Sequence, residues 1–156
     1  MLLKLENVHQ QWRSQLPTIG LPANPCTAPP INQQVTIYGW MDARIINQTT
    51  HEMESIDAGR LRYAKPNVSN CGPFKKRMWW QYYWKKYPLD GHFICFNYTH
   101  VASNPGDSGG SLVWNGTLHG VLSWGMDYFE QDNQSGYMNI CHQGYRDWID
   151  HTITKP

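Results

Sequence analysis

The sequence predicts an all-β fold, and three observations carry that prediction. Charged residues make up only 16% of the 156 residues and aromatic residues 13%, a profile typical of β-rich extracellular proteins rather than of helical cytosolic ones. Residues 35–40 alternate between apolar and polar side chains, as a half-buried strand does. The clearest hairpin lies at residues 111–124, where Asn115-Gly116 stands between two apolar runs and gives a strong turn signal.

The other elements follow from similar patterns. Residues 1–5 are apolar except for Lys4, and they indicate the end of a strand. Residues 6–30 contain five prolines, too many for a helix or a central strand, and therefore form a surface connector. Residues 145–153 place apolar side chains at helical spacing and predict a closing helix. No apolar run is long enough to span a membrane.

The strongest chemical signal is the run Gly-Asp-Ser-Gly-Gly at residues 106–110, with Ser-Trp-Gly at residues 123–125. Small neighbours allow a tight turn to present the Ser108 hydroxyl without blocking the approach of a carbonyl group. Backbone N–H groups in the same turn can face a developing oxyanion. These residues predict that Ser108 is a nucleophile.

This combination resembles the trypsin/chymotrypsin family of serine endopeptidases, and the resemblance covers the C-terminal half of the family's domain. It implies the second six-stranded Greek-key barrel of that fold followed by a C-terminal helix, with the first barrel almost entirely missing. Residues 1–30 would supply the last strand of the first barrel and the linker between barrels. Residues 31–144 would form the C-terminal barrel, and residues 145–156 the helix.

The resemblance also implies that two catalytic residues are absent. In the family, the base lies in an Ala-Ala-His-Cys motif, and none of the seven histidines here has that context. Residues 1–5 resemble the strand after the catalytic aspartate, which would stand two residues before Met1. Two hypotheses follow: a serine endopeptidase that acts through an acyl-enzyme at Ser108, written here as an inactive fragment, or a non-catalytic homologue that acts as a secreted binding module.

The family's roles pass to matching positions. The N–H groups of Gly106 and Ser108 would form the oxyanion hole, and Asp107 would make the activation salt bridge. Ala102 stands where an aspartate would select basic residues, so an uncharged pocket suited to apolar or aromatic side chains is expected. The expected substrate-binding residues are Ala102, Ser103, Ser123, Trp124, Gly125 and Gly136.

The four cysteines match two family disulfides, Cys26–Cys141 and Cys71–Cys95, and leave none over. Two other family pairs are missing at both ends. The alternative is four free thiols in a cytosolic protein. Five N-glycosylation sequons disfavour it, because they indicate a secreted chain. Residues 1–10 do not have the pattern of a signal peptide. The candidate glycosylation sites are Asn47, Asn67, Asn97, Asn115 and Asn133.

The expected partners are a peptide or protein substrate and the missing N-terminal barrel. A net charge of +1 argues against nucleic acid as a partner. The histidines are scattered without ligand spacing and no phosphate-binding loop is present, so neither a metal nor another cofactor is expected. The basic and aromatic residues 75–87 are a possible secondary contact, although an enlarged loop beside the substrate cleft is the favoured interpretation.

Overall fold

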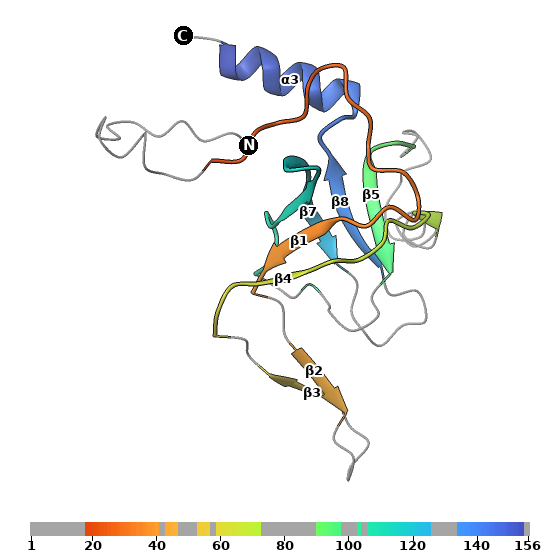
Figure 1. Ribbon diagram of the computed structural model, residues 1–156, viewed down its shortest axis with the longest axis vertical. Helices are drawn as coiled ribbons and strands as arrows, with labels where there is room; N and C mark the ends of the chain where they lie inside the picture. The colour runs from red at the N-terminus through yellow and green to blue at the C-terminus, as the bar shows by residue number, and fades with distance from the viewer. Residues whose placement is uncertain are drawn as a thin grey trace, which may run out of the picture.

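A computed structural model describes residues 18–40, 43–46, 53–56, 59–72, 90–97, 103, 106–125 and 134–154, with the backbone alone for 43–46 and 53–56. Eight strands and one helix lie in these ranges (Figure 1). They are β1 (Thr36–Gly39), β2 (Ala43–Ile46), β3 (Met53–Ile56), β4 (Arg62–Ala64), β5 (Phe93–Asn97), β6 (Ser111–Trp114), β7 (Thr117–Gly125), β8 (Gln134–Asn139) and α3 (Gln143–Thr154).

Six strands form one curled antiparallel sheet in the order β4-β1-β6-β7-β8-β5. Its two edges meet where Ser69, just beyond β4, bridges Cys95 of β5 through an N–H···O bond of 2.7 Å. The disulfide Cys71–Cys95 ties the same two edges together. The predicted all-β fold class is confirmed: the described residues are mostly β, with six antiparallel strands in a curled half-barrel and one C-terminal helix. Residues 1–5, the predicted first-barrel strand, lie outside the described ranges.

Strands β2 and β3 were not predicted. They pair with each other in a separate two-stranded sheet between β1 and β4 in the chain, and Figure 1 shows this hairpin projecting from the six-stranded sheet.

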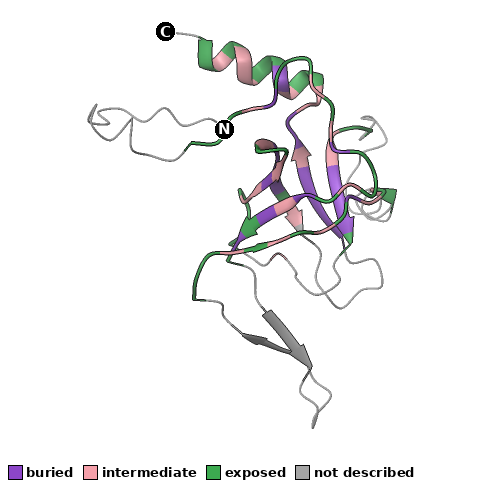
Figure 2. Ribbon diagram, in the orientation of Figure 1, coloured by how far each residue is buried: buried purple, intermediate pink, exposed green. Residues whose placement is uncertain are grey.

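The hydrophobic core is formed mainly by buried residues of β1, β5, β6, β7 and β8, and Figure 2 shows the buried residues in purple. Leu112 of β6 is fully buried and packs with Tyr137 of β8 and Phe96 of β5, whose two rings lie 5.4 Å apart. Gly120 lets β7 pass close to these side chains. A Cβ atom at Gly120 would lie 3.0 Å from the Tyr137 Cβ and 3.2 Å from the Leu112 Cβ.

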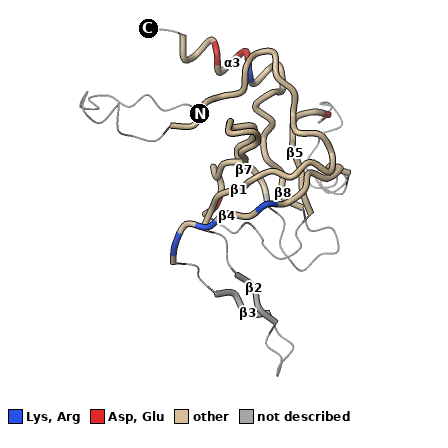
Figure 3. Tube along the Cα trace, in the orientation of Figure 1, with Lys and Arg blue, Asp and Glu red and all other residues tan. Residues whose placement is uncertain are grey.

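Helix α3 is fixed to residues 22–24, part of the predicted linker, and its Tyr145 hydroxyl lies 2.7 Å from the Nδ1 of His92, just before β5. The Arg146 guanidinium donates a 2.6 Å bond to the Pro22 carbonyl and also pairs with Asp150. Asp150 accepts a further bond from the Asn24 amide. The bond from Arg146, more than any other contact, lowers the pKa of the Asp150 carboxyl. The disulfide Cys26–Cys141 joins the linker to the start of this helix, whose acidic residues are visible in Figure 3.

His119 of β7 is buried near this disulfide. Its Nε2 lies 3.1 Å from the Thr117 hydroxyl, and its Nδ1 lies 3.6 Å from the Cys141 sulfur. The Thr117 hydroxyl donates to the Trp114 carbonyl, so it is free to accept a bond from the imidazole N–H. Burial lowers the pKa of His119 below its usual value, which favours the neutral ring.

We expect Gly120→Ala to lower the free energy of unfolding by about 1–3 kcal/mol, because the added methyl group would overpack the core. Chemical denaturation measures the change. Gly144→Ala is the matched control, since its Cβ would make only an ordinary 3.6 Å contact with the His142 ring. Equal stability of the two variants would contradict the close approach at Gly120.

Stability should fall as the pH drops below the unfolded-state pKa of His119, near 6.5. Because the folded-state pKa is lower, the unfolded chain takes up the proton first, and acid favours unfolding until the folded-state pKa is passed. His119→Gln should reduce this pH dependence in denaturation curves recorded between about pH 7 and pH 5. An unchanged dependence in the variant would show that His119 does not contribute.

Candidate active site

The loop that carries the predicted nucleophile, residues 106–110, is called the nucleophile loop, and backbone hydrogen bonds fix it to β7. The Gly109 N–H donates to the Leu122 carbonyl, and the Leu122 N–H donates to the Gly110 carbonyl, both at 2.8 Å. Within the loop, the Gly110 N–H donates to the Asp107 carbonyl at 2.8 Å. Gly106 and Gly109 have φ values of 106° and 91°, which other residues rarely adopt. The glycines of the motif therefore allow the turn that exposes Ser108.

Asp107 joins the loop to the end of β1. Its carboxylate accepts a 2.7 Å hydrogen bond from the Trp40 N–H, across 67 residues of sequence. The Asp107 residue is only 5% exposed. A buried carboxylate that accepts a backbone N–H fixes the position of the loop strongly, because a charged acceptor makes a stronger bond than a neutral one.

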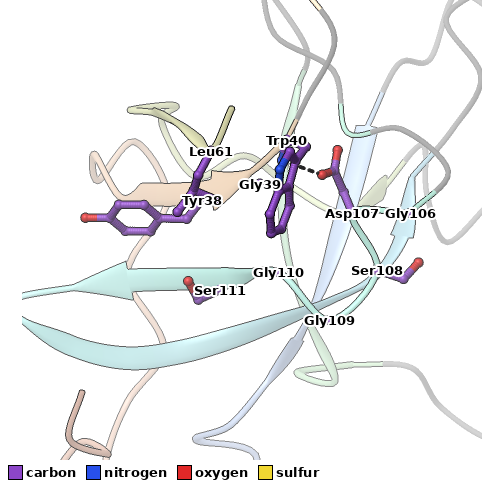
Figure 4. Close-up of a pocket in the computed structure, with 10 residues that line it drawn as sticks. All are labelled: Tyr38, Gly39, Trp40, Leu61, Gly106, Asp107, Ser108, Gly109, Gly110 and Ser111. Carbon is purple, nitrogen blue, oxygen red and sulfur yellow. Dashed lines mark hydrogen bonds between the residues drawn. The ribbon is translucent and has the colours of Figure 1, made fainter. Parts of the chain in front are cut away.

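A pocket of about 420 Å³ lies against this loop (Figure 4). Its walls are the loop itself, the end of β1 and Leu61, and its apolar side chains are Tyr38, Trp40 and Leu61. In the close-up, the Ser108 hydroxyl points outward from the loop, away from the Trp40 indole. Ser108 is solvent-exposed, so an incoming group can reach its hydroxyl.

The pocket opens onto an apolar face of β1 and β4. Tyr38 lies opposite Tyr63 in the strand register, and the two rings are 6.3 Å apart. Trp40 directly follows β1 and Leu61 directly precedes β4, and both line the pocket together with Tyr38. Exposure reaches 60% for Trp40, 59% for Leu61 and 65% for Tyr63.

A base for Ser108 is missing from the described part of the chain. His92 bonds to the Tyr145 hydroxyl, His119 faces Thr117, and neither these nor His142 and His151 line the pocket. His9, His51 and His100 lie outside the described ranges. Within those ranges, no three His, Cys, Asp or Glu side chains converge as a metal site requires. The described helix lacks the length and apolar character needed to cross a membrane.

The predicted specificity residues are only partly brought together. Ala102 lies outside the described residues, whereas the Ser103 hydroxyl lies 2.9 Å from the Ser135 hydroxyl. Ser135 is fully buried and pairs with Gly125 across β7 and β8, while Gly136 pairs with Trp124 and Cys95. The sequence predicted Gly136, and not its neighbour Ser135, as a substrate-binding residue. Strand alternation was the available signal, because Ser135 shares the face of the core residue Tyr137.

The other residues predicted from the sequence are Ser123, the cysteine pairs and the sequon asparagines. Ser123 is exposed in β7, and both expected disulfides, Cys26–Cys141 and Cys71–Cys95, are present. Asn67, Asn97 and Asn115 are exposed. Asn47, Asn133 and residues 75–87 lie outside the described ranges.

Gly110→Ala should disrupt the nucleophile loop, because its Cβ would lie 2.8 Å from the Tyr38 carbonyl oxygen and 2.9 Å from that of Asp107. We expect the Gly109 and Leu122 amides to exchange hydrogen roughly tenfold faster or more, as strain favours local opening. Gly20→Ala is the control, since nothing lies within 4 Å of its Cβ position. Unchanged exchange in Gly110→Ala would contradict the close backbone contact.

Comparison with known proteins identifies the family. The family model described as Trypsin matches residues 1–149. Anionic trypsin of Canis lupus familiaris is 29% identical to this chain, and the alignment covers 98% of this chain and 55% of the trypsin. Kallikrein-8 of Homo sapiens is 33% identical, and the alignment covers 96% of this chain and 50% of the kallikrein. A solved structure described as neuropsin, a serine protease expressed in the limbic system of mouse brain, shares the fold. The superposition has a TM-score of 0.60 and a sequence identity of 23%, and it covers 89% of this chain and 55% of the neuropsin chain.

The chain thus spans about half the length of the curated relatives that it matches. The matched region includes the Ser108 loop, the curled sheet and most of helix α3. By sequence and by fold, this chain belongs to the trypsin family.

Proposed function

We propose that this chain is the nucleophile-bearing half of a secreted serine endopeptidase, active when a second segment supplies the histidine base and the aspartate. The observation that carries the proposal is the nucleophile loop. Ser108 is exposed, the loop is fixed on both sides, and the adjacent pocket is open. Without a base, a serine hydroxyl is a weak nucleophile, so the isolated chain is inactive.

In the proposed reaction, the Ser108 oxygen attacks the peptide carbonyl carbon while the supplied histidine takes the hydroxyl proton. The N–H groups of Gly106 and Ser108 stabilise the oxyanion of the tetrahedral intermediate. The carbon–nitrogen bond then breaks, the histidine returns the proton to the leaving amine, and an acyl-enzyme remains. Water hydrolyses the ester and regenerates the Ser108 hydroxyl.

The missing segment docks on the apolar face of Tyr38, Trp40, Leu61 and Tyr63. This face is exposed and adjoins the pocket beside the nucleophile loop. A segment that binds there must also extend past the loop, because the Ser108 hydroxyl points away from Trp40 and the base must lie within hydrogen-bond reach of that hydroxyl. Exposed apolar patches of this kind are typical of surfaces that another polypeptide covers. The relatives' length, about twice that of the chain, supports a segment of comparable size as the occupant.

The preferred substrates carry an apolar or aromatic side chain before the scissile bond. Support comes from Ala102, which provides no carboxylate for a basic side chain, and from the neutral hydroxyl pair Ser103 and Ser135. Burial of an apolar side chain in an uncharged site favours binding without a charge partner.

The alternative is a secreted binding module without catalysis. It is favoured by the absence of a base among the described residues around Ser108. The same apolar face would then bind a partner that carries no catalytic groups.

A fluorophosphonate probe distinguishes these functions. The chain alone should not react, because Ser108 lacks a base. Reading the transcript upstream of the Met1 codon gives any in-frame extension. The extended chain, after removal of any propeptide, should react at Ser108 and cleave peptides with aromatic residues before the scissile bond.

Ser108→Ala in the extended chain is the control and should abolish both signals. Strong reaction of the chain alone would contradict the need for a second segment. An upstream stop codon, or an extended chain that folds but does not react, would overturn the endopeptidase proposal and favour the binding module.

A further inference from the structure

The tip of the β6–β7 hairpin combines a sequon with a defined turn. Asn115 and Gly116 have φ values of 48° and 75°. Two central residues with positive φ form a type I′ turn, which places the flanking residues directly opposite each other. Trp114 and Thr117 are that flanking pair in the strand register. The four residues Trp-Asn-Gly-Thr therefore contain a complete sequon on a two-residue turn.

The side chains at this turn suit an attached sugar. Asn115 is exposed at the tip, while Trp114 packs partly against the core and keeps part of its surface in solvent. Trp114 and Thr117 lie on one face of the hairpin, because opposed residues of an antiparallel pair project to the same side. A pyranose ring presents C–H groups on one face, and such groups pack favourably on the electron-rich face of an indole.

We propose that Asn115 carries an N-linked glycan whose first N-acetylglucosamine packs against Trp114. The inference rests on the secretory route proposed above. In the transfer, the Asn115 side-chain nitrogen attacks the anomeric carbon of a lipid-linked oligosaccharide diphosphate. The carbon–oxygen bond to the phosphate breaks, the lipid diphosphate leaves, and the nitrogen loses one proton.

The other described sequons lack this arrangement. The Asn97 oxygen accepts bonds from the Gln134 amide at 2.8 Å and from the Ser69 hydroxyl at 3.3 Å. Ser69 is itself the hydroxyl residue of the Asn67 sequon, so these two sites belong to one hydrogen-bonded group. Neither asparagine stands on a two-residue turn beside an aromatic cross-strand residue. Asn115 is therefore the described site where a glycan gains a packing surface.

The first test is occupancy. The full chain is secreted from insect or mammalian cells behind a cleavable leader and treated with peptide-N-glycosidase in ¹⁸O-water, which converts glycosylated asparagine to labelled aspartate. Mass spectrometry should find the label at residue 115 in most molecules when the enzyme is added and not in a parallel sample without it, because Asn115-Gly116 can also take up the label by spontaneous deamidation. Asn115→Gln should lose one glycan, and Thr117→Ser, which keeps the sequon, should retain it. A secreted chain with unmodified Asn115 would overturn the proposal.

The second test is packing. Trimming the glycan to one N-acetylglucosamine should leave the melting temperature unchanged, whereas complete removal should lower it by about 2–4 °C. In the Trp114→Leu chain, complete removal should have no effect, because the aromatic face is gone. An equal effect of removal in both backgrounds, or no effect in either, would refute the contact with Trp114.

Trp114 also packs against the core, so the Trp114→Leu substitution can prevent folding. In that case the contact is tested on the chain with its native Trp114. Proton resonances of the single retained sugar should be shifted upfield by the indole ring current. Resonances at the positions of the free sugar would refute the packing. These measurements involve no peptide hydrolysis, so their failure is distinct from failure of the proposed endopeptidase function.

Discussion

The paired hydrogen bonds between Leu122 and the nucleophile loop are the interaction on which the site depends. Leu122 accepts from Gly109 and donates to Gly110, so backbone groups fix the turn that exposes Ser108 to β7. The side chain of Leu122 meanwhile belongs to the core. Because β7 lies between β6 and β8, movement of this strand would disturb the core and the loop together.

Gly120 and Asp107 support the position of the nucleophile loop in two different ways. The absence of a side chain at Gly120 lets β7 approach Leu112 and Tyr137 closely, two residues before Leu122 in the same strand. Asp107 fixes the other side of the loop to the Trp40 N–H. The geometry around Ser108 is therefore determined by close backbone contacts, with little dependence on long flexible side chains.

Local sequence signals predicted the features that short segments determine. The glycine pattern at residues 106–110 predicted an exposed turn, Asn115-Gly116 predicted the hairpin, and apolar spacing predicted the helix. Features that depend on distant residues were missed. The Asp107–Trp40 bond joins residues 67 apart, and Ser135 reaches Ser103 only through the register of β8. The β2–β3 hairpin was missed because residues 47–52 contain no two-residue turn signal that fixes a register.

Trp40 connects the two halves of the proposed function. Its N–H donates to the Asp107 carboxylate, while the residue as a whole is 60% exposed on the face proposed to receive the second segment. Removing that indole from water would favour association through apolar burial and would restrict the same residue that fixes the nucleophile loop. Supply of the missing base and stabilisation of the Ser108 turn would then occur together, because both involve one residue at the end of β1.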